Sequence, residues 1–120
     1  MITIFTPTYN RAHTLGRTFE SLQAQSDRDF EWLVVDDGSS DNTVGLLSQW
    51  KDRSNFPIVV FQQKNMGKHV AINLGVQHAQ GELFFIVDSD DWLKPDAVET
   101  IKRLVSSLPV SGRYAGVSGV

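Results

Sequence analysis

The stretch Leu83-Phe84-Phe85-Ile86-Val87-Asp88-Ser89-Asp90-Asp91-Trp92 decides which fold the chain can adopt. Its five leading residues are apolar without a break, which is typical of a strand covered on both faces of a parallel sheet. If the backbone stays extended beyond them, Asp88 and Asp90 point to the same side, because side chains alternate along a strand. Carboxylates this close repel each other and are costly to desolvate. A divalent cation would relieve both costs, and oxygen ligands favour Mg²⁺ or Mn²⁺.

Taken alone, the acidic stretch is equally compatible with a solvated turn that caps the next helix, because Asp and Ser are common in turns. The rest of the chain is needed to choose between a metal site and a plain turn.

Strands and helices are predicted to alternate along the chain. Apolar, β-prone runs predict strands at 2–6, 32–35, 57–61 and 83–87. Apolar residues at three- and four-residue spacing predict a helix after each strand, the third at 68–79 and the fourth between Pro95 and Pro109. This order predicts an α/β fold with an open, mostly parallel sheet and helices on both faces.

Local signals predict how these elements begin, end and pack. Asn10 is expected to cap the first helix, Ser40 or Asp41 the second, and Gly81 is expected to close the third. The tryptophans and the early arginines are expected to have structural or solvated roles. Trp32 and Trp50 would pack in the core, Trp92 would form a lid on the last helix, and Arg11 and Arg17 would be solvated.

The length of 120 residues fits one domain. We expect it to cover residues 1–109, with the Gly- and Ser-rich stretch 110–120 as a truncated connection or tail. The net charge of −3 argues against a nucleic-acid partner. Cysteine is absent, so thiolate metal sites are excluded. With no apolar run of about 18 residues and no signal-peptide pattern, we expect a cytoplasmic protein without a membrane span in this chain; membrane association of a longer protein stays open.

Polar clusters follow the four predicted strands, at 8–10, 36–38, 65–68 and 88–91. In open α/β sheets, ligands bind at the carboxyl ends of the strands, so these clusters are expected to meet at one edge. Tyr9 offers a ring for stacking, and Asp37 offers an acceptor for a base N–H or a ribose hydroxyl. Asp88 and Asp90 with a metal could hold a diphosphate, and Lys68 at a helix start adds positive charge. Together these residues predict a nucleoside diphosphate ligand. The sequence contains neither a P-loop nor a G-x-G-x-x-G motif, which argues against the P-loop and dinucleotide-binding folds.

Four pieces of the sequence together resemble the nucleotide-sugar domain of glycosyltransferase family 2, of GT-A type. They cover about three quarters of the chain, in the family's order and spacing: Thr6-Pro7-Thr8-Tyr9-Asn10-Arg11, Val34 to Thr43 with Asp36-Asp37-Gly38-Ser39, Asn65-Met66-Gly67-Lys68 with Ala71 to Gly75, and Val87-Asp88-Ser89-Asp90-Asp91. The resemblance implies strand order 3-2-1-4 in a Rossmann-like sheet.

The resemblance also implies roles for individual residues. Pro7, Thr8 and Tyr9 would line the base pocket, Asp37 would read the edge of the base, typically uracil, and Asp36 would support that loop. Asp88-Ser89-Asp90 matches the D-x-D motif: Asp90 would be the metal ligand, and Asp88 would reach the ribose or the waters of the metal. The remaining two positions have looser roles, with Lys68 near the base or the phosphates and Asp91 orienting the segment that follows.

The family resemblance implies inverting transfer of a sugar from a UDP-type donor to a hydroxyl acceptor, with Mn²⁺ or Mg²⁺. Such transfer needs a carboxylate base. After Asp91 the only acids are Asp96 and Glu99, and neither occupies the family's base position. We therefore expect an N-terminal portion that binds the donor and transfers little alone. Two alternatives stay open: a non-catalytic nucleotide- and metal-binding module, and a Mg²⁺-dependent phosphoryl-transfer domain.

Overall fold

The computed structural model describes residues 1–107 and the strand at 117–118. The elements follow the predicted alternation: β1 (Ile2–Thr8), α1 (Ala12–Gln23), β2 (Phe30–Asp36), α2 (Thr43–Arg53), β3 (Ile58–Gln62), α3 (Lys68–His78), β4 (Leu83–Ile86), α4 (Ala97–Ser106) and β5 (Val117–Ser118). The predicted end of the last helix at Pro109 lies outside the described residues.

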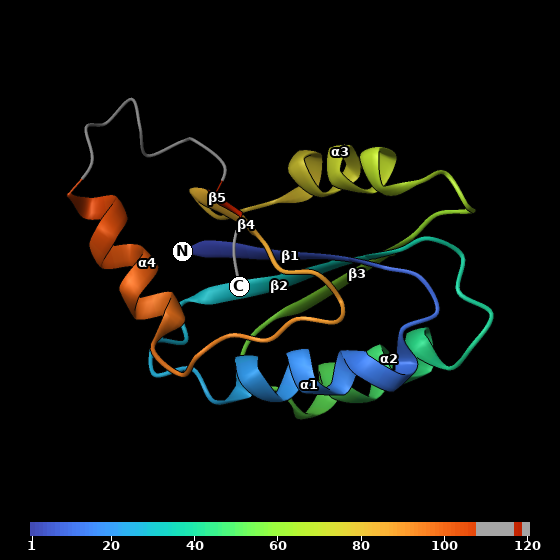
Figure 1. Ribbon diagram of the computed structural model, residues 1–120, viewed down its shortest axis with the longest axis horizontal. Helices are drawn as coiled ribbons and strands as arrows, with labels where there is room; N and C mark the ends of the chain where they lie inside the picture. Colours follow the sequence, from blue (N-terminus) through green and yellow to red (C-terminus); the bar gives the residue numbers. More distant parts are fainter. Residues whose placement is uncertain (108–116, 119–120) are drawn as a thin grey trace.

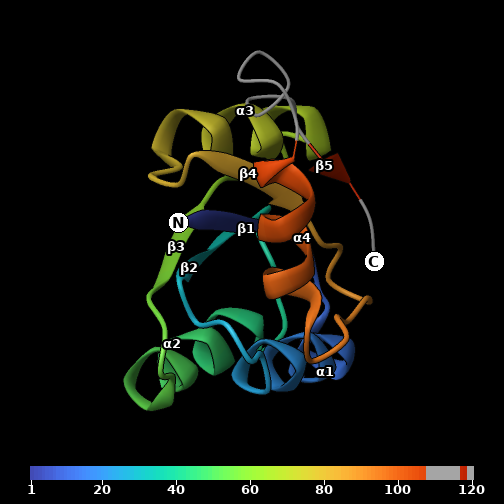
Figure 2. The same cartoon turned by 90° about the vertical axis from the view of Figure 1, so that its left-hand side faces the viewer.

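All described strands form one parallel sheet in the order β3-β2-β1-β4-β5. The predicted order 3-2-1-4 is therefore confirmed. Helices α1 and α2 cover one face of the sheet and α3 covers the other, while α4 stands across the end at which β1 begins (Figures 1 and 2). The short strand β5 pairs with β4 at Phe85 and Ile86, so two residues of the stretch 110–120 belong to the sheet.

The larger core lies between the sheet and the pair α1 and α2. Phe19 of α1 stacks between Trp50, with ring centroids 4.7 Å apart, and Trp32, at 6.3 Å. Both tryptophans are buried, which confirms their predicted packing roles. On the other face, Gly75 lets α3 approach the sheet closely, because a Cβ there would lie 2.3 Å from the ring of Phe5. Burial of these rings is the main favourable term holding the layers together.

Three predicted helix ends are wrong, because backbone geometry and distant partners decide them. The N-cap of α2 is Asn42 rather than Ser40 or Asp41, although the carboxylate of Asp41 accepts a hydrogen bond from the amide of Thr43. Asn10 does not cap α1; it has a φ of 51°, and its side-chain oxygen accepts hydrogen bonds from the amides of Ser40 and Asp41. Gly81 does not close α3, whose C-cap is Ala79. A Cβ at Gly81 would lie 2.5 Å from the amide nitrogen of Thr3, so the glycine is needed for close packing against β1.

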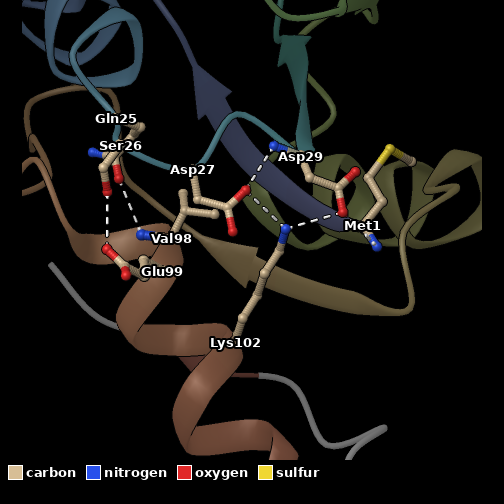
Figure 3. A network of polar contacts seen from close by, with 8 residues as sticks. All are labelled: Met1, Gln25, Ser26, Asp27, Asp29, Val98, Glu99 and Lys102. Atoms are coloured by element: carbon tan, nitrogen blue, oxygen red, sulfur yellow. Dashed lines mark hydrogen bonds and ion pairs between the residues drawn. The ribbon is translucent and has the colours of Figure 1, made fainter.

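Helix α4 is tied to the loop between α1 and β2 by a cluster of charges, the Lys102 clamp (Figure 3). The ammonium of Lys102 lies 3.0 Å from Asp27 and 3.0 Å from Asp29. The backbone amide of Asp29 and the bond from Lys102 lower the pKa of Asp27, and the bond from Lys102 lowers that of Asp29. Burial opposes ionisation of Lys102, but the two carboxylates outweigh it and raise its pKa. Both ends of the clamp therefore favour the charged forms.

No described helix has both the length and the apolar character that crossing a lipid bilayer requires.

Candidate functional site

A cavity of about 360 Å³ lies at the carboxyl ends of β1, β2 and β4. It brings together seven of the eight predicted site residues: Pro7, Thr8, Tyr9, Asp37, Lys68, Asp88 and Asp90. Asp36 does not line the cavity. It is buried beneath the rim and accepts hydrogen bonds from the amide and the hydroxyl of Ser39. The cavity is also lined by Arg11, Ala71 and Ser89, which sequence analysis did not place there.

The loops around the cavity are joined by backbone bonds that continue from the strand ends. The amide of Asp37 donates to Thr8, and that of Gln63 donates to Asp36, at 2.9 and 2.8 Å. The loop after β1 also locks onto the loop before α2, because the carboxylate of Asp41 accepts from the amide of Ala12. The rim is thus formed by segments whose relative positions are fixed by hydrogen bonds.

Thr8 carries an unsatisfied polar atom at this cavity. The residue is 4% exposed, and its hydroxyl has no hydrogen-bond partner within the described part of the chain. Buried hydroxyls are normally paired, since an unpaired one costs free energy. A polar ligand or a water in the cavity would supply the missing partner. Beside it, the ring of Tyr9 is 49% exposed and available for stacking.

Asp37 already accepts three hydrogen bonds from the segment 63–67. Its donors are the side chain of Gln63 at 3.0 Å and the amides of Met66 and Gly67 at 2.8 and 3.2 Å. Burial tends to raise the pKa of Asp37, but these three bonds together hold it below its ordinary value. A carboxylate has about four lone-pair sites, so about one stays available to a ligand.

The acidic residues meet in a turn rather than along a strand, which corrects the expectation from side-chain alternation. Strand β4 ends at Ile86, and the amide of Asp91 donates to the carbonyl of Asp88 at 3.0 Å. Carboxylate oxygens of Asp88, Asp90 and Asp91 lie within 4.8 Å of one another. Asp91, expected only to orient the next segment, therefore joins the cluster. Burial, then the charges of Asp90 and Asp88, raise its pKa.

Two cationic residues line the same cavity as the acidic turn. The ammonium of Lys68, at the start of α3, lies 3.2 Å from Asp88. Arg11 also lines the cavity, and it forms no ion pair within residues 1–107. Its position directly after the Tyr9-Asn10 loop is equally compatible with a solvated side chain, so no local signal identifies it. Arg17 is not merely solvated, because it lies 4.6 Å from the ring of Trp92. Trp92 is 49% exposed and its ring contacts Arg17 of α1, so its predicted role as a lid on the last helix stays a prediction.

The donor set of the acidic turn fits a hard divalent cation. Three carboxylates offer oxygen ligands, which Mg²⁺ and Mn²⁺ prefer, and no described sulfur or histidine ligand accompanies them. Burial, and after it the charges of Asp90 and Asp88, raise the pKa of Asp91, and a bound cation would neutralise the charge that these carboxylates share.

The family model for glycosyl transferase family 2 matches residues 3–116. An uncharacterized glycosyltransferase of Nostoc sp. is 33% identical over 92% of this chain, which spans 34% of that relative. The crystal structure of S. aureus TarS 1–349 in complex with UDP-GlcNAc matches with a TM-score of 0.78 and 25% identity, covering 88% of this chain and 31% of that one. The mannosyltransferase PcManGT from Pyrobaculum calidifontis, in complex with GDP-Man and Mn²⁺, matches with a TM-score of 0.72 and 29% identity, covering 76% and 28%. The chain thus spans about a third of the length of these proteins.

Proposed function

Because this chain belongs to glycosyl transferase family 2, we propose that its cavity binds the nucleoside diphosphate of a UDP-sugar donor together with Mn²⁺ or Mg²⁺. One observation carries the proposal: a single cavity joins an open aromatic ring, a carboxylate with a spare acceptor site, two cations and an acidic turn. These are the groups that a base, a ribose and a metal-bound diphosphate require.

The base would lie at the end of the cavity formed by the loops after β1 and β2. Tyr9 would stack on the base, and the spare acceptor site of Asp37 would take a base N–H. The unpaired hydroxyl of Thr8 would find its partner in the ligand. Pro7 would shape the floor, and Asp36 would hold the loop through Ser39. A uracil fits this pattern because its imide nitrogen offers one donor to one carboxylate acceptor.

The diphosphate would lie at the acidic turn. Asp90 would hold the metal, and Asp88 would contact the metal's waters or the ribose, with Asp91 beside them. When bound, the metal supplies positive charge that stabilises the departing diphosphate. Lys68 and Arg11 would add charge from either side of the cavity. Lys68 would exchange its ion pair with Asp88 for a phosphate oxygen.

The reaction of the whole protein would be inverting transfer. The oxygen of an acceptor hydroxyl attacks the anomeric carbon, the bond from that carbon to the diphosphate breaks, and the hydroxyl proton passes to a carboxylate base. Asp96 and Glu99 are poor candidates for this base. Asp96 is the N-cap of α4 and does not line the cavity, while Glu99 pairs with Arg103 and accepts from Ser26. We therefore expect donor binding with little or no transfer by these 120 residues alone.

Calorimetry with UDP and Mn²⁺ tests this function. We expect binding that requires the metal and that falls at least tenfold in Asp90→Ala. Asp52→Ala removes an exposed acid on α2 with the same change of charge and serves as the control. Binding that survives Asp90→Ala unchanged, or that needs no metal, contradicts the proposal. Parallel titrations with GDP decide the base, because TarS and PcManGT are bound to different nucleotides.

An assay for sugar transfer or for donor hydrolysis separates the enzyme portion from a non-catalytic module. Slow hydrolysis of UDP-sugar that is lost in Asp90→Ala would indicate that the donor is bound for chemistry. Phosphoryl transfer through Asp36 has no support in the geometry, since this carboxylate is 1% exposed and committed to Ser39.

A further inference from the structure

Helix α1 carries a stripe of polar side chains on the face that meets the segment after β4. The stripe consists of Thr14, Thr18 and Ser21 and continues with Gln25 just past the helix end. At 100° per residue, the three hydroxyl positions fall within about 60° of one another around the helix axis. In Figures 1 and 2 the segment between β4 and α4 runs back along α1.

The side chains of the stripe form hydrogen bonds with the backbone of this segment, and these bonds follow one another along the helix. The hydroxyl of Thr14 donates to the carbonyl of Ser89 at 3.1 Å, and that of Thr18 donates to the carbonyl of Asp91. Further along, Ser21 accepts from the amide of Leu93 at 3.1 Å. We call this set of bonds the hydroxyl ladder.

Gln25 fixes the far end of the same segment. Its amide donates to the carbonyl of Lys94 at 2.7 Å, and its oxygen accepts from the amide of Val98 in the first turn of α4, at 3.0 Å. Gln25 is 2% exposed, and the Lys102 clamp lies next to it (Figure 3). The start of α4 is thus anchored from the end of α1.

The segment 87–96 needs such partners because it forms neither helix nor strand. Its backbone groups have no ladder of their own, and buried ones must be paired elsewhere. The two bonds nearest the acidic turn hold the carbonyls of Ser89 and Asp91, on either side of Asp90. Thr18 is fully buried, so its bond is shielded from water.

We propose that Thr18 and Thr14 are positioning residues for the metal site: their hydroxyls hold the 88–91 turn in the shape that brings its three carboxylates together. This inference rests on the proposed function. The carboxylates repel one another, so the turn needs an external hold to keep their oxygens within 4.8 Å before a cation binds. Polar groups that orient metal ligands typically contribute 10- to 100-fold to metal affinity.

The alternative is that the ladder only satisfies buried backbone groups. In that case its loss lowers stability, as any lost buried hydrogen bond does, but the folded variant keeps its metal affinity. A positioning role instead predicts weaker metal binding at temperatures where the variant is fully folded.

The test compares Thr18→Val, which keeps the shape and removes the hydroxyl, with Thr18→Ser, which keeps the hydroxyl. Thr3→Val is the matched control: Thr3 is also fully buried, and its hydroxyl donates to Glu31, at the opposite end of β1 from the cavity. Mn²⁺ affinity is read from the free-ion signal in electron paramagnetic resonance. Amide hydrogen exchange at Asp91 and Leu93 reports the turn without any ligand.

We expect Thr18→Val to weaken Mn²⁺ affinity about tenfold and to speed exchange at both amides. We expect Thr18→Ser to restore both properties and Thr3→Val to change neither. Wild-type affinity and exchange in folded Thr18→Val would overturn the inference. If Thr18→Val does not fold, the half-buried Thr14→Val carries the same comparison. If the wild-type chain binds no Mn²⁺, both the proposed function and the role of the threonines in metal binding are overturned. The hydrogen-exchange rates then still decide whether the hydroxyl ladder holds the turn.

Discussion

Replacing Asp37 by asparagine separates the charge of this carboxylate from its shape. Asp37 accepts from Gln63 and Met66 through one oxygen and from Gly67 through the other. In Asp37→Asn the first oxygen can keep its two donors, but an NH₂ group then faces the Gly67 amide. One hydrogen bond is lost, and the other two become bonds between neutral groups.

The magnitude follows from these three contacts. A hydrogen bond to a charged group contributes about 1.5–3 kcal/mol, against about 0.5–1.5 kcal/mol between neutral groups. Losing one bond to a charged group and turning two others into neutral bonds gives a gross loss of about 4–5 kcal/mol. Partial exposure of Asp37 reduces this loss to about 1–2 kcal/mol, because water replaces part of what is lost. For a chain of this size that lowers Tm by about 4–8 °C. If the remaining acceptor site of Asp37 also accepts a hydrogen bond from the base, Asp37→Asn should lower UDP affinity at least tenfold, or by about 1.4 kcal/mol.

Thermal unfolding and calorimetry with UDP and Mn²⁺ measure the two losses. Asp52→Asn, with the same change of charge on the exposed face of α2, should leave both unchanged. The lowered pKa of Asp37 gives a further signature. A carboxyl whose pKa is lowered by folding contributes stability above its unfolded value, near pH 4, and loses it as the pH falls through the folded value. The difference in Tm between wild type and Asp37→Asn should therefore shrink as the pH falls below about 4.

Two results would refute this reasoning. Unchanged Tm at pH 7 would mean that the bonds to the 63–67 segment contribute nothing. A lowered Tm with wild-type UDP affinity would mean that Asp37 holds the loop but does not contact the nucleotide.

Three further perturbations follow from the structure. Lys102→Met removes two ion pairs and should lower the free energy of unfolding at pH 7 by about 1 kcal/mol. Because folding lowers the pKa of both partner carboxyls and raises that of the lysine, the loss should shrink in thermal unfolding as the pH falls below about 4 and as it rises above about 10.5. Gly75→Ala should destabilise the fold by about 1–3 kcal/mol in urea unfolding, since the added Cβ would overlap the ring of Phe5. Gly16→Ala, whose added Cβ would have its nearest neighbouring atom at 3.9 Å, should instead stabilise α1 by up to about 1 kcal/mol. Tyr9→Ala should weaken UDP binding by about 1–3 kcal/mol, the size of a base-stacking contact, and Tyr9→Phe should preserve it. A Tyr9→Ala variant that binds UDP as tightly as the wild type would exclude stacking.

Much of the fold was predictable because its signals are local. Unbroken apolar runs predict buried parallel strands, and apolar periodicity predicts the helices between them. Strands β1 and β2 nevertheless extend beyond those runs. Strand β2 begins at Phe30 and includes Glu31, which is 4% exposed. A buried glutamate is tolerated because the hydroxyl of Thr3 and the amide of Gln80 donate to it. These partners are distant in sequence, so no local pattern predicts them.

The predicted roles of Asp36, Asp37 and Lys68 in nucleotide binding stay predictions. Their meeting place was predictable, since polar residues at the ends of parallel strands converge at one edge of the sheet. Arg11 was missed because an arginine after a loop has the same local pattern whether it is solvated or faces a cavity.

By itself the sequence determined the alternation of strands and helices and the edge at which the polar loops meet, because both follow from the period and the ends of each apolar run. Only the tertiary structure decided the shape of the acidic turn. It brought Asp91 into the cluster and set Thr14 and Thr18 against carbonyls that lie 75 and 73 positions away. In the sequence these threonines have the pattern of a solvated helix face. Their partners are backbone carbonyls, which every residue carries, so side-chain identity alone gives no sign of the contact.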